Sequence, residues 1–204
     1  MKRTSYHKML WYFFVFLALS WSYTFSYKKG GDVAPATPKV ESKVRVGFDI
    51  DDTLLFSTPN FKNAFKSGVK PYSEKFWSLV NKNDYKYSKI KFSVKKIVEK
   101  HLKNGDEVFV ITARQDKDGK YLRKFLNKNF GIPVQNIYFA PEGKTELIKK
   151  LKIKVFYGDS DSDMQCAIDA GAKPVRILRA EESSYKKSYN VGSFNEEVIP
   201  DTKW

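Results

Sequence analysis

Short apolar runs alternate with amphipathic stretches along most of this chain, and this alternation limits the folds open to it. The run at residues 44–50 is β-branched and apolar, as expected of a buried strand, and similar runs follow. Between them, apolar residues recur every three or four positions, which predicts helices. We therefore predict an α/β fold with a mostly parallel sheet and helices on both faces. The further strands are predicted at residues 107–112, 136–140, 153–157 and 174–178, and the helices at residues 93–104, 118–130, 145–151 and 161–171.

The stretch between the first two predicted strands is long. Residues 60–83 mix aromatic and polar side chains, which favours short helices. We expect a small helical cap within residues 57–103, in a folded domain that spans residues 44–204. Ligands of parallel sheets bind beyond the carboxyl ends of the strands, so a cap there would shape the binding site.

The first 27 residues have the two parts of an export signal. A start rich in Lys and Arg covers residues 1–8, and an uncharged, mostly apolar run covers residues 9–19. Because the uncharged stretch continues further, a cleaved signal peptide and an uncleaved anchor through residues 9–27 both stay open. Residues 28–43 contain Gly, Pro and Lys and are predicted to form a linker or extended arm.

Composition restricts the kinds of metal site. The single cysteine, Cys166, excludes an intramolecular disulfide framework and a thiolate zinc site. His7 and His101 lie far apart in the sequence, so any metal should be held by oxygen, which favours ions such as Mg²⁺. We assign the formal charge of +14 to a solvated, lysine-rich surface and expect no nucleic-acid polymer as a partner, because no nucleic-acid-binding motif is visible.

The strongest chemical signal is the segment Asp49-Ile50-Asp51-Asp52 at the end of the first predicted strand. Asp49 and Asp51 are two residues apart, so in extended backbone they project to the same side. Three carboxylates beside buried side chains repel one another, and a cation would relieve that repulsion. The alternative interpretation is a solvated acidic turn or a helix N-cap, in which Asp52 or Thr53 caps the segment that follows.

A second acidic segment, Asp159-Ser160-Asp161-Ser162-Asp163, follows another predicted strand. Ser160 or Asp161 is expected to cap the helix that comes next. Two Asp-rich strand ends in one parallel sheet lie at the same edge. Together the two segments predict an oxygen-only magnesium site.

Thr112 and Lys144 offer groups suited to phosphate. Thr112 ends a predicted strand and is followed by Ala113. Its hydroxyl and the free backbone N–H groups there can hold phosphate oxygens. Lys144 precedes a predicted helix, whose N-terminus adds a favourable field for an anion. Taken singly, a strand-ending threonine and a surface lysine are the ordinary interpretations of these residues.

In this order, the four elements resemble the haloacid dehalogenase superfamily of phosphotransferases. The closer resemblance, over residues 44–199, is to the class B non-specific acid phosphatases of bacterial periplasms. It rests on VGFDIDDTLLFSTPNF, VFVITAR, VFYGDSDSD and a tail containing RILRA and GSFNEEVI. The resemblance implies a haloacid dehalogenase-like fold and hydrolysis through an aspartyl-phosphate. Asp49 would be the nucleophile, and Asp51 would protonate the leaving oxygen and then activate water.

The resemblance also implies one Mg²⁺ per subunit. The carboxylates of Asp49 and Asp159 and the backbone carbonyl of Asp51 would hold it, with Asp163 orienting the site. Asp51 needs a proton in the first step, and crowding by Asp49 and Asp52 is expected to raise its pKa.

Thr112, the Ala113 N–H group and Lys144 would bind the phosphate. Ala113 stands where the family usually has glycine, and its added methyl is expected to tighten this site. Arg114 is expected at the pocket mouth. A leaving-group pocket for a nucleoside base or an aryl ring would be formed by Phe61, Trp77 and Tyr185.

We expect an exported, Mg²⁺-dependent acid phosphatase acting on nucleotides, aryl phosphates and other organic phosphomonoesters, with phosphotransfer to alcohols as a side activity. The resemblance implies a periplasmic homo-oligomer, of which a tetramer is one form, although the N-terminal arm is shorter than the family's. Two alternatives stay open. One is a narrow-specificity 5′-nucleotidase or sugar phosphatase of the same superfamily, and the other is a non-catalytic, membrane-tethered binding protein.

Overall fold

Strand β1 lies inside the sheet on which the fold is built, between β4 and β6. The computed structural model describes residues 43–200 and 204. Within them, six strands form one sheet in the order β5-β4-β1-β6-β7-β8, and every neighbouring pair is parallel. The predicted parallel α/β fold is confirmed. The strands are β1 (Arg45–Phe48), β4 (Glu107–Thr112), β5 (Ile137–Phe139), β6 (Val155–Gly158), β7 (Lys173–Ile177) and β8 (Glu197–Ile199).

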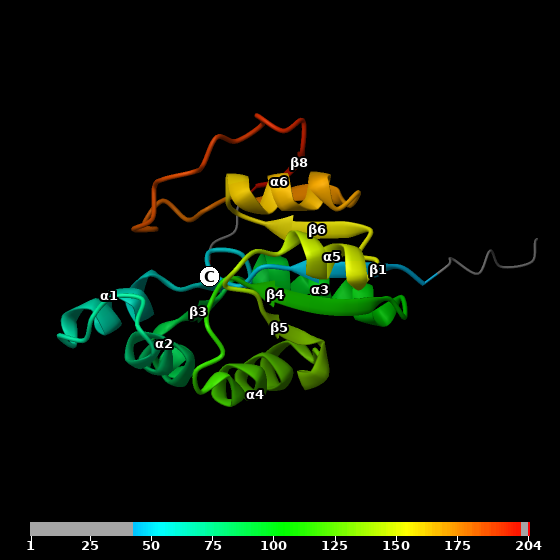
Figure 1. Ribbon diagram of the computed structural model, residues 1–204. Coiled ribbons are helices and arrows are strands. Elements are labelled where there is room, and N and C mark those ends of the chain that lie inside the picture. Colours follow the sequence, from blue (N-terminus) through cyan, green and yellow to red (C-terminus); the bar gives the residue numbers. More distant parts are fainter. Residues whose placement is uncertain (1–42, 201–203) are drawn as a thin grey trace, which may run out of the picture. The chain divides into compact units, whose positions relative to one another are not determined.

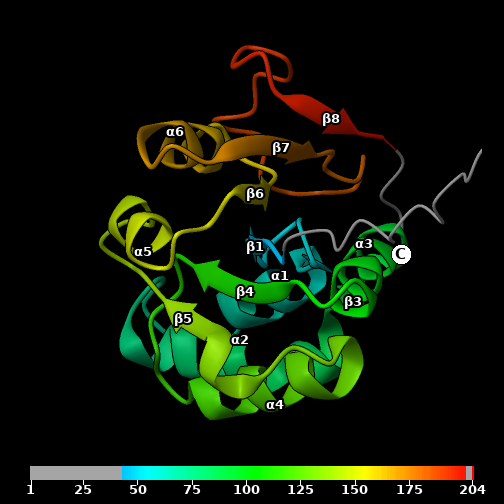
Figure 2. The ribbon, with the colours of Figure 1, turned by 90° about the vertical axis from the view of Figure 1, so that its right-hand side faces the viewer.

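The side chains of β4 show why helices cover both faces of the sheet. Val108 and Val110 belong to one buried apolar cluster, and Phe109 and Ile111 belong to another. Successive side chains of a strand point to opposite faces, so each cluster needs its own helical layer. Helices α3 and α4 cover the first cluster and α5 and α6 the second, and Figure 2 shows α5 and α6 across the strands from α3. The helices are α3 (Phe92–Lys103), α4 (Gly119–Phe130), α5 (Thr145–Lys150) and α6 (Asp161–Asp169).

A helical hairpin is inserted between β1 and β4. Figure 1 shows its two helices beyond the end of β1. Ala64, Phe76 and Val80 form a buried cluster of its own. The predicted range 57–103 contains this hairpin, but its last helix, α3, packs on the sheet. The hairpin consists of α1 (Thr58–Lys66) and α2 (Glu74–Tyr87), with an antiparallel pair at its base, β2 (Leu55–Phe56) and β3 (Lys89–Ile90).

Most element boundaries match the prediction within a few residues, and the differences have local causes. Strand β1 ends at Phe48, because the carbonyl of Ile50 already accepts two hydrogen bonds from the turn that follows. Helix α6 begins after Ser160, whose side chain forms a reciprocal capping box with Asp163. Ser160 is one of the two residues predicted to cap this helix. Strand β8 was not predicted. It is three residues long, too short for a pattern of its own, and it is defined by pairing with β7.

Residues 1–42, where the export signal and nearly all of the linker are predicted, lie outside the described residues. Among the helices that the structure describes, none combines the length and apolarity needed to cross a membrane.

A buried ion pair holds the segment after β7 against the sheet. Arg176 of β7 is fully buried; its Nε donates to Glu196 Oε1 at 2.8 Å, and its Nη1 donates to the Asp159 carbonyl at 2.9 Å. Glu196 also accepts the backbone N–H groups of Gly192 and Phe194. Burial alone would raise the pKa of Glu196, but these hydrogen bonds lower it to about 2. The pair therefore ties this tail segment to the end of β6.

We expect Glu196→Gln to lower the free energy of unfolding at pH 7 by about 2 kcal/mol, because the buried charge of Arg176 loses one of its two carboxylate partners and keeps Asp161. A carboxylate with a depressed folded pKa contributes stability above its unfolded pKa and loses it as the pH falls through the folded value. The difference between the two proteins should therefore shrink as the pH falls from 4.5 to about 2. Urea unfolding across this range measures it, and a difference independent of pH would contradict the prediction.

Candidate active site

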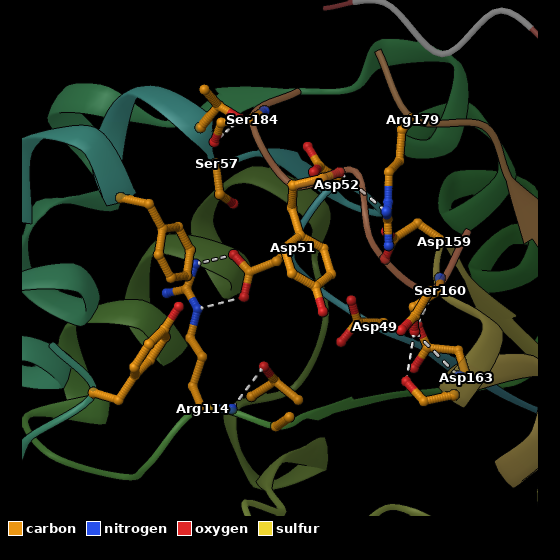
Figure 3. A pocket seen from close by; sticks show the side chains of 18 of the residues that line it. Asp49, Asp51, Asp52, Ser57, Arg114, Asp159, Ser160, Asp163, Arg179 and Ser184 are labelled. Carbon is orange, nitrogen blue, oxygen red and sulfur yellow. Dashed lines mark hydrogen bonds and ion pairs between the residues drawn. The ribbon is translucent and has the colours of Figure 1, made fainter. Parts of the chain in front are cut away.

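Three neighbouring strands end at one edge of the sheet, and this edge carries the predicted site. Asp49 follows β1, Thr112 ends β4 and Asp159 follows β6. Both β4 and β6 pair with β1 in parallel, so their carboxyl ends come together. A cavity of about 740 Å³ is found here, part of which Figure 3 shows. Its lining includes every site residue predicted from the sequence: Asp49, Asp51, Thr112, Ala113, Lys144 and Asp159.

Lys144 holds two buried carboxylates together. Its Nζ lies 2.5 Å from Asp49 Oδ1 and 2.6 Å from Asp163 Oδ1, and all three residues are buried. Burial alone would lower the pKa of Lys144, but Asp163 and Asp49 raise it above its usual value, so the ammonium stays charged. Of the two interpretations of Lys144, the structure supports the buried, functional one and not the surface lysine.

Asp159 completes an acidic cluster. One carboxylate oxygen from each of Asp49, Asp159 and Asp163 lies within 4.8 Å of the others. Burial and the charge of Asp163 raise the pKa of Asp159 to about 7, and burial raises the pKa of Asp49 despite the opposing charge of Lys144. Besides Lys144, the guanidinium of Arg179 faces the cluster, because its Nε donates to Asp159 Oδ2. Burial and crowding oppose the ionised forms of Asp49 and Asp159, and a divalent cation would offset both effects, so this oxygen-only donor set fits such an ion.

Asp163 already has partners for both carboxylate oxygens. Its Oδ1 accepts from Lys144, and its Oδ2 accepts from the backbone N–H and the hydroxyl of Ser160. This close packing requires Gly158, since a Cβ there would lie 2.3 Å from the Cβ of Asp163. Asp163 thus positions Lys144 and completes the capping box of α6. Asp159 accepts from Arg179 and, at 3.4 Å, from the Thr53 hydroxyl, so Asp49, which among the described residues accepts only from Lys144, is the most available metal ligand of the three.

Asp51 is held by a buried arginine. The Nε and Nη2 atoms of Arg114 donate to the two carboxylate oxygens of Asp51 at 2.9 and 2.6 Å (Figure 3). Burial alone would raise the pKa of Asp51, but the pairing with Arg114 lowers it below its usual value. The expectation that crowding by Asp49 and Asp52 raises this pKa is therefore wrong. The predicted place of Arg114 at the pocket mouth is also wrong, because the residue is 1% exposed and contributes to the wall beside Asp51.

The inserted hairpin fixes Arg114 from its other side. The guanidinium Nη1 lies 2.6 Å from Oδ2 of Asp84 and 3.2 Å from Oδ1 of Asn81, both on α2. Asp84 is fully enclosed and also accepts from Asn60 of α1, while Asn81 donates to two backbone carbonyls of the loop after β4. No motif marks these residues in the sequence, because Asp and Asn on an amphipathic helix usually face solvent.

The third carboxylate of the first acidic segment joins two loops. Asp52 Oδ2 accepts from the Ser183 hydroxyl at 2.5 Å. The Nζ atom of Lys91 donates to the backbone carbonyls of Asp52 and Leu178 at 2.6 and 2.7 Å. Lys91 is fully buried, and burial lowers its pKa to about 8. Asp52 therefore does not cap the next helix, whose N-cap is Ser57; it attaches the loop after β7 to the loop after β1.

Aromatic side chains form another part of the cavity wall. The three expected from the sequence, Phe61, Trp77 and Tyr185, all line it. Phe61 and Trp77 come from the hairpin, and their rings meet edge to face with centroids 6.1 Å apart. Tyr185 comes from the loop after β7, where the Arg179 guanidinium lies 4.9 Å from its ring centroid. The wall suits a leaving group that carries a planar ring.

Comparison with known proteins assigns this arrangement to a family. The sequence profile of the HAD superfamily, subfamily IIIB (acid phosphatase), matches residues 24–188. The chain belongs to the subfamily IIIB acid phosphatases. It is 38% identical over 174 residues to a class B acid phosphatase from a Rahnella species, covering 79% of this chain and 73% of that protein. A class B acid phosphatase from Klebsiella pneumoniae is 37% identical over 172 residues, covering 78% and 73%. The activity of this chain is phosphomonoester hydrolysis.

Solved structures show the fold of this phosphatase at low sequence identity. A HAD family hydrolase from Deinococcus radiodurans with bound phosphate and sodium has a TM-score of 0.53 at 11% identity, covering 78% of this chain and 92% of its own. A haloacid dehalogenase-like hydrolase from Streptococcus pneumoniae has a TM-score of 0.52 at 15% identity, covering 77% and 93%. These likenesses support the fold alone.

We expect Gly158→Ala to abolish most of the phosphatase activity and to lower the free energy of unfolding by about 1–3 kcal/mol. The new methyl group would push Asp163 away from Lys144. Steady-state kinetics and urea unfolding measure both effects. Gly68→Ala is the control: a Cβ there meets nothing within 4 Å, so its positive φ costs about 1 kcal/mol and kcat should not change. Equal kinetic effects of the two substitutions would contradict the prediction.

Asp84→Asn tests the support of Arg114 by the hairpin. We expect kcat to fall about tenfold, because Arg114 is then free to shift and to carry Asp51 with it. The KM should change less than twofold if the phosphate-binding residues stay in place. Asp118→Asn, which removes a partly exposed ion pair with Lys82, is the control and should leave both constants unchanged. A wild-type kcat in Asp84→Asn would show that Arg114 needs no support from α2.

Proposed function

We propose that this phosphatase is an exported, Mg²⁺-dependent enzyme that forms an aspartyl-phosphate on Asp49. The observation that carries the proposal is the setting of the Asp49 carboxylate. It is buried at a strand end, 2.5 Å from the Lys144 ammonium and within 4.8 Å of the Asp159 carboxylate. Burial raises its pKa, and the Lys144 ammonium opposes that rise by stabilising the ionised form that a nucleophile needs.

The reaction takes two steps. In the first, an Asp49 oxygen attacks phosphorus, the bond from phosphorus to the leaving oxygen breaks, and that oxygen takes a proton from Asp51. In the second, Asp51 takes a proton from water, the water oxygen attacks phosphorus, and the bond to Asp49 breaks. One water is consumed, inorganic phosphate and an alcohol are released, and Asp51 regains its proton.

Asp51 must hold a proton before the first step, whereas its pairing with Arg114 favours the carboxylate. We propose that Asp51 turns away from Arg114 when a substrate binds. The negative phosphoryl group then raises the pKa of Asp51 and lets it take up a proton. An acidic medium favours this step, which supports an acid pH optimum.

The carboxylates of Asp49 and Asp159 and the backbone carbonyl of Asp51 would hold Mg²⁺. The crowding of buried carboxylate oxygens within 4.8 Å of one another supports this assignment. When bound, the cation supplies neutralisation of the charge on the transferred phosphoryl group.

Thr112, Ala113 and Lys144 bind the phosphoryl oxygens in this proposal. Thr112 Oγ1 already accepts the Arg114 backbone N–H at 3.3 Å, which orients its hydroxyl at the end of β4. Ala113 is exposed within the lining of the cavity, and Lys144 is charged. Positioning and charge neutralisation of this kind are what phosphoryl transfer chiefly requires.

The aromatic wall supports substrates with planar leaving groups, including nucleotides and aryl phosphates. Stacking accepts any planar ring, so it favours broad specificity over a single nucleotide or sugar phosphate. If an alcohol replaces water in the second step, phosphotransfer to that alcohol follows.

Location and assembly stay proposals that rest on sequence. The pattern of residues 1–27 supports export to the periplasm, as a mature protein or as one anchored through residues 9–27. The family resemblance supports a homo-oligomer, of which a tetramer is one form.

Phosphate release from p-nitrophenyl phosphate and 5′-AMP tests the proposed function. We expect turnover of both with Mg²⁺, its loss with EDTA, and a drop of at least about a thousandfold in Asp49→Asn. Asp169→Asn, an exposed change on α6, is the control and should keep full activity. Turnover that survives EDTA would overturn the metal requirement, and turnover by Asp49→Asn would overturn the nucleophile.

A further inference from the structure

The inserted hairpin carries an aromatic cluster larger than one planar leaving group needs. The buried ring of Phe76 is surrounded by four rings with centroids 5.0 to 6.0 Å away. Each outer ring also meets the next, with centroids 6.0 to 6.4 Å apart. The outer rings all line the cavity, and they belong to Phe61, Phe65, Tyr72 and Trp77.

One side of this circle of rings lies beside the catalytic groups, and the other side is exposed to solvent. Arg114, which holds Asp51, lies 5.8 Å from the centroid of Phe61. The ring centroid of Phe65 lies 6.4 Å from that of Phe61 and 6.0 Å from that of Tyr72, and Trp77 closes the circle between Tyr72 and Phe61. Phe65 is 44% exposed and Tyr72 is 58% exposed. The outer end of the cavity is therefore a pair of apolar rings open to solvent.

One base of a mononucleotide is too small to cover all four rings. A planar base stacks on one or two rings at a time, so a base that stacks on Phe61 leaves part of the circle uncovered. Exposed apolar rings at the rim of a cavity mark a place where a ligand binds. Lys62 of α1 lines the same cavity and is exposed, so the cavity also offers a cation to a ligand.

We propose that Phe65 and Tyr72 form a distal stacking subsite, which with Lys62 adapts this phosphatase to 5′-phosphorylated dinucleotides. The inference rests on the proposed function, since the terminal phosphate still reacts at Asp49. The first base stacks on the inner rings, the phosphodiester faces Lys62, and the second base stacks on the distal pair. Hydrolysis consumes one water and releases phosphate and the dephosphorylated dinucleotide.

The exposed side chains that line the cavity favour a dinucleotide over a substrate that carries a single large ring. A dinucleotide has two π-faces and one further negative charge, which match two exposed rings and one cation. Base–aromatic stacking tolerates any base, so the subsite needs no base-specific partner.

The first experiment compares 5′-AMP, the dinucleotide pApA, and a pApA analogue whose second residue lacks its base. We expect the KM for pApA to be at least fivefold below that for 5′-AMP, because stacking adds affinity outside the reacting group. The abasic analogue keeps the second phosphate alone, and its KM should lie between the other two. Equal KM values for pApA and 5′-AMP would overturn the subsite.

Substitutions then locate the subsite. Phe65→Leu and Tyr72→Leu keep an apolar side chain but remove the aromatic face, and each should raise the KM for pApA at least fivefold. Neither should change kcat or KM for 5′-AMP more than twofold. Lys62→Gln should raise the KM for pApA and for the abasic analogue alike. Tyr85→Leu is the control, since Tyr85 is an exposed tyrosine on α2 outside the residues that line the cavity.

Binding to the Asp49→Asn protein separates this inference from the proposed mechanism. Tryptophan fluorescence should report tighter binding of pApA than of 5′-AMP, and Phe65→Leu should remove the difference. If both binding results are obtained but the wild-type protein hydrolyses neither pApA nor 5′-AMP, the proposed function is contradicted and the subsite stands. If the wild-type protein hydrolyses both substrates but Phe65→Leu and Tyr85→Leu weaken the binding of pApA equally, the proposed function stands and the subsite is overturned.

Discussion

The contact on which this site depends is the bridge from Lys144 to Asp49 and Asp163. One buried ammonium lies between two buried carboxylates, and the charges of all three are stable only together. Asp163 also caps α6, so the start of that helix fixes the position of Lys144. Because an unpaired buried charge costs several kcal/mol, this geometry limits which residues can follow β1 and β6. Gly158 is one result, since a larger residue would displace Asp163.

A second network, centred on Arg114, connects the catalytic carboxylate Asp51 to the inserted hairpin. Arg114 pairs with Asp51 on one side and with Asp84 of α2 on the other. The same helix supplies Trp77 to the cavity wall. The general acid of the proposed mechanism and the surface that receives the leaving group are therefore attached to one element. A shift of the hairpin would change both the setting of Asp51 and the shape of the pocket.

Much of the fold could be predicted because its signals are local. Buried strands followed by Asp-rich turns mark the ends of β1 and β6, and parallel topology places those ends at one edge. The roles of Arg114 and Asp84 could not be predicted in this way. Each looks like an ordinary surface residue in its own segment, and 30 positions separate them. Their burial depends on where the hairpin packs, which no local pattern records.

The sequence alone determined the order of most strands and helices and the two acidic segments at strand ends, whereas the short β8 left no pattern and Lys144 was singled out by resemblance to a family. The order and the acidic segments follow from hydrophobic periodicity and from the need of clustered charges for a cation, both of which are properties of short segments. Only the tertiary structure decided the ionisation of Asp51, the burial of Arg114 and the reach of the aromatic wall. The physical reason is that a pKa and an exposed surface depend on distance and desolvation, and packing of distant segments sets both.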